Sequence, residues 1–239
     1  MIAFRDVTMG FNDLVILDRF SQAFEENKVH CILGPSGCGK TTLLNLLSGI
    51  VVEASGQITK PERVSYVFQE ESLIPQKTAR KNLELVLKSV YKTNAELTTV
   101  IDKFLKLSNL EQAADLYPHE MSGGMRQRLA LIRAFAYPSD ILLMDEPFKA
   151  LDVSLRDSLI RSFIDLYEED RRTVLFVTHD MDEALMTGDV IYVYSHKPMR
   201  LQRKFALDGD KRSRKIYDEH ITRVKNEIYR ETEKWQLHG

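Results

Sequence analysis

The sequence has little cysteine, no long apolar stretch and no strong excess of charge of either sign. Its only two cysteines are Cys31, in a predicted buried strand, and Cys38, within a glycine-rich loop, so we expect reduced thiols. No apolar run approaches the roughly 18 residues that cross a bilayer, and the N-terminus lacks the basic and apolar segments of a signal peptide. The net charge of −2 argues against a broad basic surface for nucleic acid. We therefore expect a cytoplasmic protein with no nucleic-acid partner.

A glycine-rich run with the spacing G-x-x-x-x-G-K-T is the most informative feature that is present. Its members are Gly34, Pro35, Ser36, Gly37, Cys38, Gly39, Lys40, Thr41 and Thr42. The pattern predicts a buried strand over Val29–Leu33 before the run and a helix over Thr41–Ser48 after it. In that context the loop can direct its backbone N–H groups toward a β-phosphate at the positive end of the helix. The run therefore predicts nucleotide binding.

Three side chains of this run have predicted roles toward a nucleotide. Lys40 should reach the β- and γ-phosphates, Thr41 should place its hydroxyl on Mg²⁺, and Thr42 is a candidate for the α-phosphate. A glycine-rich turn without a ligand is the alternative, and the combination of strand, loop, lysine and threonine disfavours it. We therefore expect ATP and Mg²⁺ as the cofactors.

The hydrophobic pattern predicts an α/β chain with a helical insertion. Predicted strands lie at Val15–Leu17, Val29–Leu33, Val64–Phe68, Ile141–Met144 and Val174–Val177. Predicted helices between Gln69 and Pro138 lie at Thr78–Tyr91, Ala95–Leu107 and Gly124–Ala136. Two strand-like runs follow Val190, and a charged helix is predicted over about Ser213–Trp235. The basic run 211–215 is predicted to be a solvated loop, and Tyr217, Ile221, Val224 and Ile228 a stripe packed on the same domain.

An acidic pair, Asp145 and Glu146, ends the predicted strand at Ile141–Met144. This is the Walker B arrangement, in which Asp145 holds Mg²⁺ through water and Glu146 faces the γ-phosphate. A strand-end acidic pair can also be only a helix cap or a surface turn, but the phosphate loop favours the catalytic interpretation. Glu146 is then the candidate that takes a proton from the attacking water or positions that water.

The segment 121–128 resembles the signature motif of ABC ATPases. Ser122, Gly123 and Gly124 open a predicted helix, where a hydroxyl, free amides and the helix dipole form a second anion site. A bare Ser-Gly-Gly before a helix is usually just an N-cap, so its meaning comes from the order of the motifs. The resemblance implies that this signature faces the γ-phosphate bound by the other subunit. It therefore implies a homodimer with ATP at the interface.

Four further positions match the family's motif order. Gln69 is similar to the Q-loop glutamine that approaches Mg²⁺ and the attacking water, and His179 to the switch histidine that contacts the γ-phosphate. Asp152, in the segment 150–152, resembles the D-loop that crosses the dimer interface, and Phe11 the aromatic residue that stacks on adenine. Each residue also has a simpler interpretation when it is taken alone. Gln69 could be a polar strand end, and His179 could be a surface residue. Asp152 could start a helix, and Phe11 could pack the N-terminal strands.

The resemblance covers nearly the full chain and implies a P-loop NTPase (RecA-like) α/β fold with a mixed sheet, an N-terminal antiparallel β subdomain and an inserted α-helical subdomain. We expect one ABC ATPase domain over residues 1–239. Its core with the β subdomain is predicted at 1–70 and 137–210, its helical subdomain at 71–136 and its C-terminal helix at 211–239.

The motif details resemble ATPase subunits of bacterial importers, nearest to the nitrate, sulfonate and taurine group, whose relatives include importers of thiamine-precursor pyrimidines. Met125 and Phe148 support this resemblance. It implies peripheral attachment at the cytoplasmic face of the inner membrane, integral membrane permease subunits, and a periplasmic or lipoprotein solute-binding protein. An exporter motor, a soluble ABC ATPase and an ATP-binding scaffold are the alternatives. Lys149 and Gln76 depart from the family pattern, at the predicted dimer and permease contacts respectively.

Overall fold

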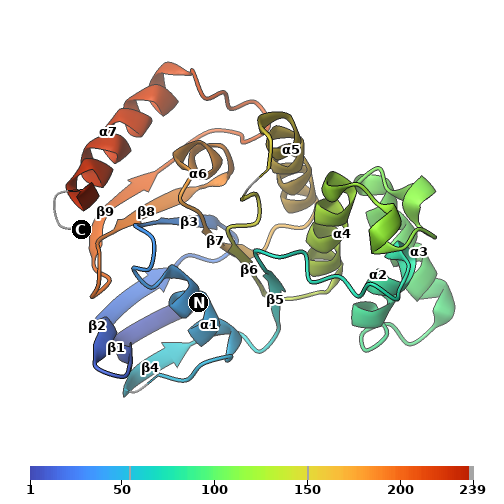
Figure 1. Ribbon diagram of the computed structural model, residues 1–239, viewed down its shortest axis with the longest axis horizontal. Helices are drawn as coiled ribbons and strands as arrows, with labels where there is room; N and C mark the ends of the chain where they lie inside the picture. The colour runs from blue at the N-terminus through green and yellow to red at the C-terminus, as the bar shows by residue number, and fades with distance from the viewer. Residues whose placement is uncertain (54, 150, 237–239) are drawn as a thin grey trace.

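The computed structural model describes residues 1–53, 55–149 and 151–236, and two β-sheets organise them (Figure 1). The smaller sheet is antiparallel, in the order β2-β1-β4. The larger has the order β5-β6-β7-β3-β8-β9, parallel throughout except for the β8–β9 pair. The strands are β1 Ile2–Phe11, β2 Leu14–Phe24, β3 Val29–Leu33, β4 Ser55–Thr59, β5 Val64–Val67, β6 Ile141–Asp145, β7 Thr173–Val177, β8 Val190–Tyr194 and β9 Leu201–Ala206.

Helices flank the sheets, and three of them form the predicted helical insertion. The helices are α1 Lys40–Ser48, α2 Ala79–Leu87, α3 Asn94–Leu107, α4 Gly123–Ala136, α5 Val153–Glu169, α6 Met181–Thr187 and α7 Glu219–Gln236, with short 3-10 turns at Glu111–Ala113 and Pro118–Glu120. Figure 1 shows α2, α3 and α4 gathered to one side of the larger sheet, whereas β1, β2, β4 and α1 lie together. The mixed sheet and the N-terminal antiparallel sheet confirm the predicted fold class.

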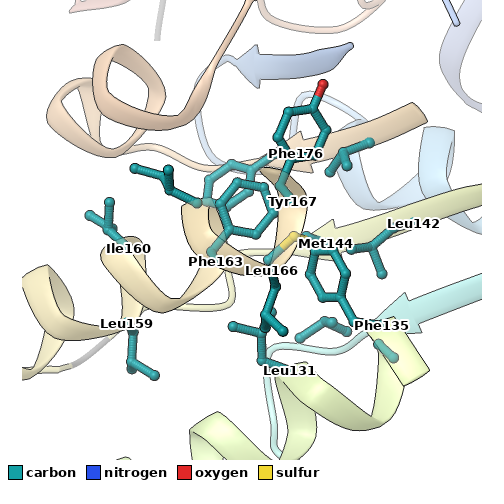
Figure 2. Packing of buried hydrophobic residues seen from close by; sticks show 14 of the residues in the cluster. Leu131, Phe135, Leu142, Met144, Leu159, Ile160, Phe163, Leu166, Tyr167 and Phe176 are labelled. Atoms are coloured by element: carbon teal, nitrogen blue, oxygen red, sulfur yellow. The ribbon is translucent and has the colours of Figure 1, made fainter. Parts of the chain in front are cut away.

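Each face of the larger sheet covers its own hydrophobic core, because successive strand residues point to opposite faces. One face, including Leu143 and Leu175, packs with α1 and the antiparallel sheet. The other, including Met144 and Phe176, packs with the remaining helices. Figure 2 shows the second core, where Phe163 of α5 lies between the rings of its neighbours. Burial of the central strands on both faces explains why they are continuous apolar runs.

The C-terminal region differs from the prediction in two ways. The helix α7 begins at Glu219 rather than near residue 213, and the basic run before it is not simply solvated. Lys211 and Arg214 are 4% and 7% exposed: Lys211 forms an ion pair with Asp189, and Arg214 donates hydrogen bonds to four backbone carbonyls. These contacts hold the segment in a non-helical path. Tyr217, at the start of the predicted stripe, is 74% exposed, while Ile221, Val224 and Ile228 are buried as expected.

Candidate functional site

Four sequence motifs follow four neighbouring parallel strands of the larger sheet. Gln69 follows β5, Glu146 follows β6, His179 follows β7 and the phosphate loop 34–42 follows β3. Because β5, β6, β7 and β3 are adjacent and parallel, their carboxyl ends share one edge. Ligands of open α/β sheets bind at such an edge. The structure therefore brings these segments, which are far apart in the sequence, to one candidate nucleotide site.

The phosphate loop curls tightly around the side chain of Lys40. Lys40 Nζ donates hydrogen bonds to the carbonyl oxygens of Gly34 at 2.8 Å and Pro35 at 2.9 Å. Gly39 caps the N-terminus of α1 with a φ of 122°, and a Cβ at this position would lie 2.6 Å from Ile16 Cγ2. Only glycine adopts this conformation readily and fits this space. The loop thus places a cation and the positive end of a helix together, which suits a phosphate.

Cys38 is part of this loop but is buried, with 1% of its surface exposed. Burial raises the pKa of its thiol, and burial raises the pKa of Cys31 to about 12. Both cysteines are free, as the sequence predicts. Thiols held in the protonated form are poor nucleophiles, so Cys38 contributes backbone and packing to the loop rather than reactive sulfur.

Asp145, at the end of β6, faces the first turn of α1. Burial raises the pKa of Asp145, and a hydrogen bond with Thr41 partly offsets that effect. The Tyr66 hydroxyl also donates to Asp145 Oδ2, at 3.5 Å. A hydroxyl and a carboxylate side by side are hard oxygen donors, and Mg²⁺ at nucleotide sites commonly takes only one or two protein ligands. The pair therefore fits Mg²⁺, although the described residues contain no cluster of three or more acidic, histidine or cysteine ligands.

Glu146 has an unusual backbone conformation for a residue with a side chain. Its φ is 45°, and its N–H donates to Val177 O on β7 at 2.9 Å. Its Oε2 lies 2.7 Å from Lys149 Nζ and 3.4 Å from His179 Nδ1. Burial would raise the pKa of Glu146, but Lys149 and His179 outweigh burial and hold the pKa below its ordinary value. Glu146 is therefore an ionised carboxylate beside the predicted switch histidine.

The segment that carries His179 is fixed by its neighbours. Thr178 Oγ1 donates to Glu183 Oε2 at 2.6 Å and accepts from the N–H of Asp180 at 3.0 Å. Asp180 caps α6 and forms an ion pair with Arg156 of α5 at 2.8 Å. The imidazole itself is largely exposed, with 58% of its side chain accessible. The backbone of the segment is thus anchored while the ring can reach a ligand at the edge.

The remaining predicted residues lie on other elements. Ser122 caps α4 by accepting from the N–H of Met125 at 3.3 Å, and Asp152 caps α5. A Cβ on Gly124 would lie 2.4 Å from Leu155 Cδ1, so the signature segment packs against the first turn of α5. Residue 150 of the predicted D-loop lies outside the described residues. Phe11, at the end of β1, is 49% exposed on the antiparallel sheet.

Three contacts of the site were not predicted from the sequence. They are the Tyr66 hydrogen bond to Asp145, the Thr178–Glu183 pair and the Lys149–Glu146 ion pair. Each depends on the register of neighbouring strands or on the path of a turn. For the Lys149–Glu146 pair, the only signal in the sequence was the spacing of three residues. Side chains at this spacing come together in a turn or a helix but not in an extended strand.

Comparison with known proteins shows the family of the chain. A sequence model described as ABC transporter matches residues 17–149. The chain belongs to the ABC transporter family. The nitrate import ATP-binding protein NrtD of Synechococcus elongatus is 37% identical to it over 195 residues, which cover 77% of this chain and 71% of NrtD. The taurine import ATP-binding protein TauB of Rhizobium johnstonii is 38% identical over 200 residues, covering 80% of this chain and 76% of TauB.

Solved structures of an ABC cassette extend the comparison. The dimeric structure of MJ0796, a bacterial ABC transporter cassette, matches with a TM-score of 0.74 and 30% identity over 87% of this chain and 100% of that one. A post-hydrolysis structure of the same cassette, bound to ADP and Pi, matches equally well. This ABC protein is an ATP-binding motor subunit that hydrolyses ATP to ADP and phosphate. Among its described helices, none is both long and apolar enough to span a membrane.

Proposed function

We propose that this ABC ATPase drives an importer, with Glu146 as its catalytic carboxylate and the shared strand edge as its active site. The observation that carries the assignment is the convergence of the phosphate loop, Asp145, Glu146 and His179 at the ends of neighbouring parallel strands. Similar sites elsewhere work mainly by positioning phosphates and stabilising their charge. In this chain, residues at the one strand edge would both position the phosphates and stabilise their charge.

The residues at this edge would have different roles in binding and hydrolysing ATP. The loop amides and Lys40 hold the β- and γ-phosphates, while Thr41, Asp145 and Gln69 lie in the segments that would hold Mg²⁺, which neutralises phosphate charge when bound. Glu146 accepts a proton from the attacking water or orients it, and the exposed ring of His179 contacts the γ-phosphate. Asp145 would therefore act on Mg²⁺, and Glu146 would act on the attacking water.

The signature and D-loop residues would act across a dimer. Ser122, Gly123, Gly124 and Asp152 lie at the starts of α4 and α5 rather than at the strand edge of their own chain. The N-terminus of a helix favours an anion, and the related cassette MJ0796 is dimeric. Two head-to-tail copies would bring the start of α4 from one copy to the nucleotide on the other, while Phe11 stacks on adenine. ATP binding would join the copies, and hydrolysis would release them.

The importer assignment rests on relatives and motif details. Both NrtD and TauB are named as importer subunits, for nitrate and taurine. We infer a similar role for this chain, peripheral on the cytoplasmic face of the membrane, with integral permease subunits and a separate solute-binding protein. The solute would be a small molecule of the nitrate, sulfonate, taurine or thiamine-precursor kind. It would contact the permease and binding protein, not this ATPase.

The substitution Glu146→Gln tests the central assignment. It keeps the size of the side chain but removes the charge that accepts a proton, so turnover should fall by about a hundredfold or more while ATP binding persists. ATP should then hold the variant as a dimer, measured by size-exclusion chromatography with multi-angle scattering. The exposed Glu169→Gln is the control and should behave as the wild type. Rapid turnover by Glu146→Gln would refute the role of Glu146.

A further inference from the structure

The turn after β6 places a lysine directly against the proposed catalytic carboxylate. Lys149 Nζ lies 2.7 Å from Glu146 Oε2, and the backbone N–H of Lys149 donates to Glu146 O at 3.2 Å. The cation and the carboxylate therefore belong to one tight turn. No separate movement of a domain is needed to bring them together.

Neighbouring elements hold this turn on both sides. Glu146 is tied to β7 through Val177, and Gln127 of α4 donates a side-chain hydrogen bond to the carbonyl of Pro147. Phe148 is 2% exposed and packs against Phe176 with ring centroids 5.6 Å apart. Because the first three residues of the turn are held by these contacts, the fourth residue, Lys149, stays next to the Glu146 carboxylate.

Two cationic or potentially cationic groups face the same oxygen of Glu146. Oε2 is 2.7 Å from Lys149 and 3.4 Å from His179. The Glu146 side chain is 15% exposed, whereas the Lys149 side chain is 44% exposed. The carboxylate is therefore the more buried partner of this ion pair, and its Oε2 atom is itself buried. An oxygen whose lone pairs interact with an ammonium is a poorer acceptor for a proton of water.

We propose that Lys149 is a positioning residue that holds Glu146 in an ion pair and limits the basal rate of ATP hydrolysis. The inference rests on the proposed role of Glu146 in activating water. During turnover the ion pair must loosen before Oε2 is available, while His179 turns to the γ-phosphate. Lys149 therefore sets how often the carboxylate is free in the isolated ATPase.

The size of the effect follows from the exposure of the pair. Ion pairs with a partly exposed partner contribute modestly, so releasing Glu146 should raise kcat about fivefold, equivalent to about 1 kcal/mol. KM for ATP should stay within about twofold, because Lys149 contacts the carboxylate rather than the phosphate loop. A gain in rate is informative because a merely destabilised variant would lose activity.

The experiment compares steady-state ATP hydrolysis by the isolated full chain and its variants at saturating ATP and Mg²⁺. Lys149→Met should raise kcat, whereas Lys149→Arg, which keeps the cation, should retain the wild-type rate. Lys106→Met, at an exposed position on α3, is the matched control and should change nothing. An unchanged or lower kcat in Lys149→Met would overturn the proposal.

A double variant separates this inference from the role of Glu146 itself. If Lys149 acts through Glu146, then Glu146→Gln with Lys149→Met should be as inactive as Glu146→Gln alone. Its ATP-dependent dimer should also have the affinity of the Glu146→Gln dimer. A tighter dimer, or a rate gain in the double variant, would show that Lys149 acts elsewhere and would overturn the proposal. Turnover by Glu146→Gln alone would instead refute the proposed function.

Discussion

Glu183 of α6 is 4% exposed, and its carboxyl accepts a hydrogen bond from Thr178 Oγ1 at 2.6 Å. Burial raises the pKa of Glu183 from 4.5 to about 7, despite the hydrogen bond with Thr178, which lowers it. Between these values the folded chain retains a proton that the unfolded chain has released. The contribution of Glu183 to the free energy of unfolding should therefore decrease as pH rises from 4.5 to about 7, and then level off.

Glu183→Gln replaces the carboxyl with an amide that stays neutral and can still accept the hydrogen bond from Thr178. Raising a pKa from 4.5 to about 7 corresponds to about 3 kcal/mol. Below the lower value both chains carry a neutral side chain here, so their stabilities should be similar. Above the higher value the variant should be more stable than the wild type by about 3 kcal/mol.

Urea unfolding at intervals from about pH 4 to about pH 8, followed by circular dichroism, measures this difference directly. Subtracting the wild-type curve from that of Glu183→Gln removes the titration of groups common to both. Glu169→Gln makes the same chemical change at an exposed position of α5 and should give a flat difference. A flat difference for Glu183→Gln would refute the burial argument. A variant less stable than the wild type at about pH 8 would show that the charged carboxylate is stabilised by its neighbours.

Three further substitutions test the loop and the core. Lys40→Ala should weaken nucleotide binding by about a hundredfold, because it removes the buried cation that is proposed to hold the phosphates, and titration of a fluorescent ATP analogue measures this. Gly39→Ala should destabilise the fold by about 2 kcal/mol or more, because its φ is 122° and the new methyl would meet Ile16; thermal unfolding checks it. Phe163→Ala should cost about 3–5 kcal/mol through the cavity left in the core of Figure 2, measured by urea unfolding. An unchanged nucleotide affinity in Lys40→Ala, or an unchanged stability in either of the other two variants, would contradict the structural reason given for that variant.

The phosphate loop and the central strands could be predicted from the sequence because their signals are local. The predicted strand Val29–Leu33 agrees with β3, and the predicted strands at Ile141–Met144 and Val174–Val177 agree with β6 and β7 to within one residue. Burial on both faces produces continuous apolar runs, and a phosphate loop requires a fixed order of residue types. The family's motif order then indicated which strand ends carry the candidate site.

The edges of the fold were less predictable because long-range contacts decide them. The resemblance implied an N-terminal antiparallel β subdomain, but no residue ranges were predicted for β1 and β4. The residues of β4 are almost all exposed, so no apolar alternation marks this strand. The start of α7 was predicted too early because Arg214 and Lys211 find hydrogen-bond and ion-pair partners on α6 and in the turn between α6 and β8. A run of basic residues normally indicates a solvent-exposed segment. Only the folded structure shows the carbonyl groups and the carboxylate with which these two side chains form hydrogen bonds and an ion pair.

The backbone at Glu146 shows how the strand edge can present two successive carboxylates to different partners. A φ of 45° at a residue with a side chain costs about 1–2 kcal/mol, and the hydrogen bond to Val177 holds the chain there. In a continued strand, successive side chains would point to opposite faces of the sheet, and the second would enter a hydrophobic core. Because the chain turns instead, Asp145 faces Thr41 while Glu146 faces Lys149 at the open edge. The strain is thus the cost of placing both charges beside the phosphate loop, which the proposed chemistry requires and the packing of the sheet alone does not.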